Sequence, residues 1–120
     1  MPQVPRIWGP GRPRTSTVLH LHNLERPYID QFSDFNPPVV QYSLKTSGIP
    51  ISEFRAHYSQ PIAGGVDEID YEKLTTEEIR KQWKEAREQA GAKYIAAPGC
   101  SVPNASTPEE LSRFPRALGI

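Results

Sequence analysis

The chain has 120 residues, a length that fits one small domain better than two. Its 14 Lys and Arg residues balance 14 Asp and Glu residues, so no excess of positive charge predicts a nucleic-acid partner. A single cysteine excludes an internal disulfide framework, and no apolar run approaches the roughly 18 residues that a membrane-spanning helix needs. We therefore expect a cytoplasmic protein that makes no use of a membrane.

The first sixteen residues differ in composition from the remainder. Prolines crowd this segment together with three arginines, Arg6, Arg12 and Arg14, so it predicts a stiff, basic arm over 1–16 that precedes the folded domain over 17–120. The hydrophobic fraction of 37% and the mean hydropathy of −0.58 are low for a core that stands alone. We expect some apolar surface to be buried between chains.

The folded region begins with a strand that carries two histidines. Residues 17–22 alternate so that Leu19 and Leu21 lie on one face while His20 and His22 lie on the other. Helices and strands then alternate along the chain. In order, we predict a helix over 25–35, a strand over 39–45, a helix over 51–58, a strand over 61–66, a helix over 75–90, a strand over 93–97 and a helix over 107–118.

The helix over 75–90 has the clearest signals. Thr75 and Glu78 match a capping box, and Gly91 follows the last apolar position as a stop. The last helix begins similarly, with Thr107 as its cap and Pro108 at its first position.

Four strand–helix units predict an α/β fold with a parallel sheet and right-handed crossovers. Eight such units form a (β/α)8 barrel, also called a TIM barrel, and this chain holds half that number. An open four-stranded sheet exposes two edges, which a second copy of the chain would cover. We therefore predict a (βα)4 half-barrel that is completed by homodimerisation.

Three side chains suggest a metal site. His20 and His22 aim two imidazoles at one point, and the only cysteine, Cys100, follows the last strand. Three protein ligands of this kind with one open position are typical of a catalytic zinc ion. The alternative is a pair of hydrogen-bonded interior histidines and a small buried cysteine. His57, on a short helix, suits a surface role better than ligation.

Acidic residues follow the third strand and offer a second candidate for chemistry. Asp67, Glu68 and Asp70 stand after its Gly-Gly end, where an acid can act as a base or orient a ligating histidine. Asp67 is the candidate catalytic residue; the alternative is that these acids solubilise the loop and cap the next helix. Lys45 would face the barrel interior and pair with an acid or an anionic ligand.

Five segments together resemble the C-terminal half of the uroporphyrinogen decarboxylase family, which includes the zinc-using, cobalamin-dependent methyltransferases. The matching segments are Thr17-Val-Leu-His-Leu-His-Asn23, Ile62-Ala-Gly-Gly-Val-Asp67, Thr75-Thr-Glu-Glu-Ile79, Tyr94-Ile-Ala-Ala-Pro-Gly-Cys-Ser-Val-Pro103 and Thr107-Pro-Glu-Glu-Leu111. The Gly-Cys-x-Val-Pro ending and the Thr-Pro helix start that follows it are the most specific of these.

The resemblance implies roles for particular residues. His20 matches the first zinc ligand of the methyltransferases, Cys100 matches the last, and His22 stands where the family usually has a cysteine. The implied reaction is methyl transfer from a cobalamin, held on a partner protein, to a small thiol that zinc activates. The decarboxylase branch implies a tetrapyrrole instead, but its carboxylate-binding arginines belong to an N-terminal half that this chain lacks, and Arg6, Arg12 and Arg14 match no motif there.

Three classes of function stay open from the sequence. The first is an enzyme that transfers a methyl group to a thiol. The second is a module that binds a metal or ligand without turnover. The third is a structural homodimer whose histidines hydrogen bond to one another.

Overall fold

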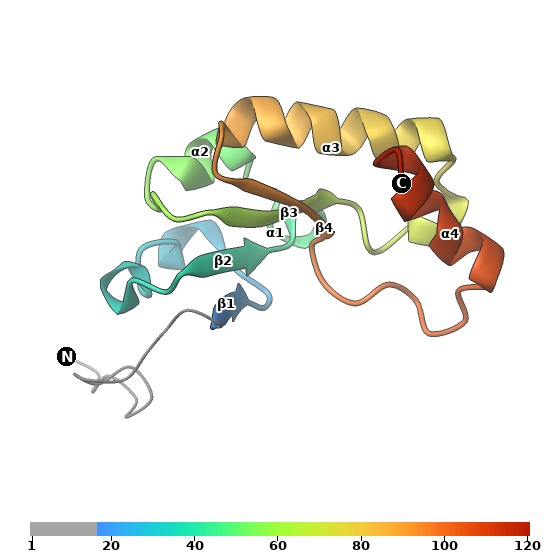
Figure 1. The fold of residues 1–120 in the computed structure, drawn as a ribbon. Coiled ribbons are helices and arrows are strands. Elements are labelled where there is room, and N and C mark those ends of the chain that lie inside the picture. Colours follow the sequence, from blue (N-terminus) through green and yellow to red (C-terminus); the bar gives the residue numbers. More distant parts are fainter. Residues whose placement is uncertain (1–16) are drawn as a thin grey trace.

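The computed structural model describes residues 17–120, so the arm predicted over 1–16 lies outside the described residues. The fold is a four-stranded, fully parallel sheet that alternates with helices, in the order β1-β2-β3-β4 (Figure 1). The strands are β1 (Val18–Leu21), β2 (Val39–Tyr42), β3 (Ile62–Val66) and β4 (Tyr94–Pro98). The α-helices are α1 (Leu44–Ser47), α2 (Ile51–Arg55), α3 (Thr76–Ala90) and α4 (Pro108–Ala117), and three 3-10 turns are η2 (Arg26–Tyr28), η3 (Ser33–Phe35) and η4 (Tyr71–Lys73). The predicted α/β class with a parallel four-stranded sheet is confirmed.

One face of the sheet packs against α2 and α3, which lie above it in Figure 1. Val40 and Tyr42 of β2 point into this core, where the Tyr42 ring stacks on Phe54 at 4.1 Å between centroids. Phe54 stacks in turn on Tyr58, and the Tyr58 hydroxyl donates to the carbonyl of Ile29 at 2.6 Å. The stacked rings therefore join α2, β2 and the segment after β1 into one apolar layer.

The opposite face carries one row of paired positions across the sheet. In strand order the row consists of His20, Gln41, Ala63 and Ile95. Because Val40 and Tyr42 point into the helix-covered core, their neighbour Gln41 must point to this other face. The side-chain amide of Gln41 donates to the carbonyl of Pro98 at 2.9 Å. Ile95 is 45% exposed. This face therefore holds His20 and an apolar side chain that the described residues leave open.

The two longest helices begin as their sequences predict. The Thr75 hydroxyl accepts a hydrogen bond from the Glu78 amide, and Gly91 ends α3 with a φ of 81°. At α4 both halves of a capping box form between Thr107 and Glu110, with Pro108 at the start of the helix. These helix boundaries are confirmed.

The predicted helix over 25–35 is wrong. The chain forms two separate 3-10 turns there, and Asn36 follows with a φ of 45°. The Ser33 hydroxyl donates to the carbonyl of Asp30 at 2.9 Å, a local bond that competes with a continuous helix. Ile29 is nevertheless buried.

The strand predicted over 39–45 is too long. It ends at Tyr42, and Ser43 becomes the cap of α1 by accepting a hydrogen bond from the Thr46 amide at 3.1 Å. Lys45 consequently lies on α1 rather than on a strand facing the sheet interior. Serine is a preferred N-cap residue, and here its cap overrides the strand alternation.

The described part of the chain, residues 17–120, holds no helix with the length and hydropathy needed to cross a membrane.

Candidate metal centre

The two histidines lie where β1 ends. His20 is on the strand, and His22 follows it by one residue. Asn23 then takes a φ of 53°, the left-handed conformation that asparagine tolerates better than most residues. The chain turns away at this point, which leaves both imidazoles at the carboxyl end of the sheet. Their ring centroids are 5.8 Å apart, and the ring planes are tilted by 39°.

Cys100 lies at the same carboxyl end of the sheet, after β4, which is the strand at the opposite edge. Gly99 continues the β3–β4 pairing by donating its amide to the carbonyl of Val66 at 3.1 Å, and the chain bends at Gly99 and Cys100. A Cβ atom at position 99 would lie 2.6 Å from the Cα atom of Ser43 and 3.0 Å from Oε1 of Glu68. Only glycine allows this approach, so Gly99 sets the position of the cysteine beside it.

The structure brings all three predicted ligands together. One ligand atom from each of His20, His22 and Cys100 lies within 4.8 Å of the others, and all three residues belong to the same chain. A flat sheet would hold β1 and β4 about 14 Å apart, since neighbouring strands are about 4.8 Å apart. The cluster therefore depends on a curved sheet face and on the bend after Pro98.

The donor set and its surroundings fit zinc. Two imidazole nitrogens and a thiolate are preferred zinc ligands, and tetrahedral coordination would require the three atoms to draw together by about 1 Å. Both ring nitrogens of His20 are buried, and neither has a hydrogen-bond partner among the described residues. Buried polar atoms normally have partners, so His20 lacks the one that a metal ion would supply. The alternative of two histidines that hydrogen bond to each other does not describe His20.

A cavity of about 250 Å³ opens beside the cluster. It is lined by His20, Leu21, His22, Asn23, Ser43, Thr46, Glu68, Ile69, Cys100 and Ser101. Glu68 is only 2% exposed, and its Oε1 atom has no hydrogen-bond partner among the described residues. The three ligands thus share a cavity with a buried carboxylate.

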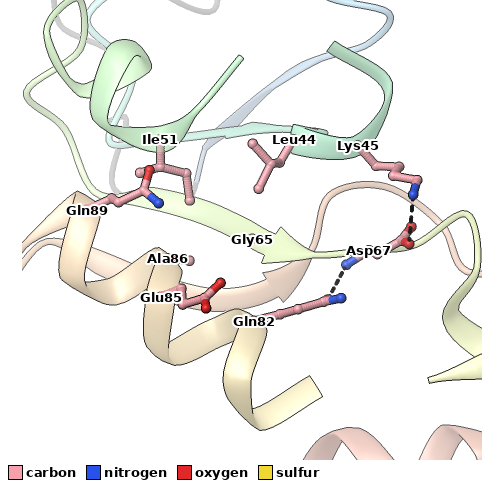
Figure 2. A pocket seen from close by; sticks show the side chains of 9 residues that line it. All are labelled: Leu44, Lys45, Ile51, Gly65, Asp67, Gln82, Glu85, Ala86 and Gln89. Carbon is pink, nitrogen blue, oxygen red and sulfur yellow. Dashed lines mark hydrogen bonds and ion pairs between the residues drawn. The ribbon is translucent and has the colours of Figure 1, made fainter. Parts of the chain in front are cut away.

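Asp67, the candidate catalytic residue, lies in a different cavity. That second cavity, of about 190 Å³, is between α1, β3 and α3 (Figure 2). The Asp67 carboxylate accepts from the amides of Ile69 and Asp70 at 2.8 and 3.2 Å, and Lys45 Nζ lies 3.7 Å from it. The Asp67 amide donates to Gln82 of α3 at 2.9 Å. Asp67 therefore ties the loop after β3 to its neighbours. It does not cap the next helical turn, η4, whose N-cap residue is Asp70 and which has no side-chain cap among the described residues.

The two adjacent acids lie in different cavities, Asp67 in the second cavity and Glu68 in the cavity of the three ligands. This separation is not predicted from the sequence. The sequence pattern groups Glu68 with Asp67 and Asp70 as three acids that follow the strand. The available signal was position: Glu68 stands one residue farther along the loop than Asp67, and neighbouring side chains in extended chain point to opposite sides. His57, as expected, lies outside the cluster, where its Nδ1 contacts the carboxylate of Asp30.

Comparison of the chain with models of known protein families and with curated proteins finds no match.

Proposed function

We propose that His20, His22 and Cys100 hold a zinc ion, and that the protein activates a small thiol there for methyl transfer. The observation that carries this proposal is the convergence of three zinc-type ligands beside a cavity, with both nitrogens of His20 buried and unpartnered. The motifs that resemble the uroporphyrinogen decarboxylase family, and its methyltransferase branch in particular, support the same reaction.

The number of ligands favours a reactive centre over a structural one. Structural zinc sites usually have four protein ligands, whereas catalytic sites have three and leave one position for water or substrate. A zinc ion in such a site lowers the pKa of a bound thiol, which makes its sulfur nucleophilic near neutral pH. The protein would contribute the rest: His20 on β1 and His22 directly after this strand would hold and orient the ion, and the cavity would admit the thiol.

The cavity volume separates the two branches of the resemblance. About 250 Å³ lies below the range of about 300–1,000 Å³ that pockets for drug-sized ligands have. A small thiol suits this space better than a tetrapyrrole does. We therefore favour methyl transfer over decarboxylation of a porphyrin precursor.

The proposal includes a second copy of the chain. The strands β1 and β4 are both sheet edges, and Val18 on β1 and Ile95 on β4 are 53% and 45% exposed. Unpaired parallel edges with exposed apolar side chains favour pairing with another chain. Two copies that join edge to edge would form an eight-stranded (β/α)8 barrel with a zinc site in each half.

Metal content tests the site. The full chain, purified without added metal and then given one equivalent of zinc, should retain about one zinc ion per chain after gel filtration. Cys100→Ala and His20→Ala should lose it, and His57→Ala, which changes a histidine outside the cluster, should not. Equal zinc retention by all four proteins would contradict the proposed site.

Turnover separates the enzyme from a binding module. With methylcobalamin and 2-mercaptoethanol, the zinc-loaded protein should form the S-methyl product, with the thiol proton released and the bonding electron pair left on cobalt. The apoprotein and Cys100→Ala should not accelerate this reaction. A protein that binds zinc and shows no metal-dependent turnover would be a binding module.

Molar mass tests the half-barrel. Light scattering should give twice the chain mass for the wild type and the single-chain mass for a Val18→Lys, Ile95→Lys double variant, because charges at both edges oppose pairing. Leu111→Lys, which changes an exposed apolar residue of α4, is the matched control and should remain dimeric. A monodisperse, folded wild-type monomer would exclude the barrel closed by two copies.

A further inference from the structure

Glu68 lines the cavity beside the three candidate ligands, which we call the metal cavity. Its side chain is 98% buried, since only 2% is exposed, and Oε1 has no hydrogen-bond partner among the described residues. A carboxylate in such a position is costly unless a cation or hydrogen-bond donor faces it. The described residues leave that role to a ligand.

The position of the carboxylate is built into the fold. The Oε1 atom lies so close to the chain at Gly99 that a Cβ there would approach it to 3.0 Å. Gly99 precedes Cys100, so the carboxylate is held beside the segment that carries the thiolate ligand. A small ligand bound through sulfur at the metal would therefore share one cavity with Glu68.

Among the described residues 17–120, no side chain with a permanent positive charge lines the cavity and balances the charge of Glu68. Its ten lining residues include neither Lys nor Arg. Lys45 precedes the lining residue Thr46. It points instead toward Asp67 and Asp70, with its Nζ atom 3.7 Å from a carboxylate oxygen of each. A zinc ion held by the two imidazoles and the cysteine thiolate would have one positive charge, which a bound substrate thiolate would neutralise. A positive group on the same ligand would then complement Glu68.

We propose that the thiol substrate carries an ammonium group, and that Glu68 binds this group while the sulfur occupies the open position at the metal. The substrate class is thus a small aminothiol, which a cavity of about 250 Å³ accommodates. This inference rests on the proposed zinc site and narrows its substrate. Glu68 sets specificity here and does not act as a metal ligand.

A charge series of small thiols tests the inference without any assay of turnover. The full chain is loaded with Co²⁺, and the sulfur-to-cobalt absorption band is followed during titration with cysteamine, 2-mercaptoethanol and 3-mercaptopropionate, which are cationic, neutral and anionic. The three thiols differ in their own acidity. The decisive quantity is therefore the ratio of the cysteamine affinity to the 2-mercaptoethanol affinity in the wild type, compared with the same ratio in Glu68→Gln.

In the wild type this ratio should exceed that of Glu68→Gln by about tenfold or more, the effect typical of a buried charge-assisted hydrogen bond. Glu85→Gln changes an exposed glutamate of α3 that lines the second cavity and should leave the ratio unchanged. Equal ratios in wild type and Glu68→Gln would overturn the inference.

A second measurement does not depend on the folding of any variant. In the wild type, 3-mercaptopropionate should bind more weakly than 2-mercaptoethanol, because its carboxylate would face Glu68. Equal or tighter binding of the anionic thiol would overturn the inference while leaving the zinc site intact. Failure of every thiol to alter the cobalt band would overturn the proposed function, and this inference with it.

Discussion

Two cavities at the carboxyl end of the sheet differ in how their polar groups are satisfied. In the cavity of Figure 2, the Asp67 carboxylate accepts two backbone amides, Gln82 accepts the Asp67 amide, and Gln89 accepts the amide of Ser52 at 3.1 Å. In the metal cavity, the nitrogens of His20 and the Oε1 atom of Glu68 are buried and have no hydrogen-bond partner within residues 17–120. The first cavity holds its own loops together. The second contains groups that lack a partner among the described residues, and for this reason we propose it as the functional site.

Zinc should produce the largest difference between the two cavities. At about 1,000 times its Kd, a bound ion stabilises the folded state by about 4 kcal/mol, which raises the Tm of a domain of this size by more than about 10 °C. We expect this rise for the wild type and for His57→Ala in calorimetry with and without zinc. A similar rise in Cys100→Ala would show that zinc acts at another place.

Two glycines allow the cavities to be disturbed separately. A Cβ at Gly65 would lie 2.5 Å from Cβ of Ala86, and the φ of 97° disfavours any side chain. Gly65→Ala should therefore cost about 3 kcal/mol in urea denaturation while the folded fraction still binds zinc normally.

Gly99→Ala should, in contrast, weaken zinc binding as well as stability. Its Cβ would collide with Ser43 and crowd Glu68, so the segment that carries Cys100 must shift. We expect a stability cost of about 1–3 kcal/mol together with a loss of zinc affinity of about 10-fold or more in a chelator competition. Unchanged zinc affinity in this variant would show that the close approach at Gly99 does not position the ligand.

Removing the cation of the second cavity should have a small effect. Lys45 is half exposed and lies 3.7 Å from the Asp67 carboxylate, a geometry worth about 1 kcal/mol or less. Lys45→Met should shift the urea midpoint only slightly and leave zinc binding and the thiol affinities unchanged. A large loss of thiol affinity would instead connect the two cavities.

A change at Glu110 should have the smallest effect on stability. The pKa of Glu110 lies below its usual value because its side chain accepts a hydrogen bond from the Thr107 amide at 2.8 Å. A lowered pKa in the folded state means that the contribution to stability is complete above the unfolded pKa and is lost as the pH falls through the folded pKa. The acid limb of the stability profile should therefore be slightly shallower in Glu110→Gln, and NMR titration of Glu110 should give a midpoint below that of a free glutamate.

Local signals predicted the sheet and most helices correctly, and they erred where two signals competed. The strand over 61–66 and the helices after Thr75 and Thr107 needed only an apolar pattern and a cap, and each is present with nearly the predicted bounds. At Ser43 a helix cap interrupted the alternation of a strand, and at Ser33 a side-chain bond to the backbone replaced a helix. Both serines offer the backbone a local hydrogen bond, which periodicity alone does not register.

The sequence by itself determined the order of the strands, the faces of β1 and the three side chains able to bind a metal, because these follow from periods of two and 3.6 residues and from ligand chemistry. Only the tertiary structure decided that Cys100 reaches His20 from the far edge of the sheet, and that Glu68 rather than Asp67 shares their cavity. The physical reason is that both results depend on sheet curvature and on a backbone approach at Gly99. Each arises from contacts between segments far apart in the chain.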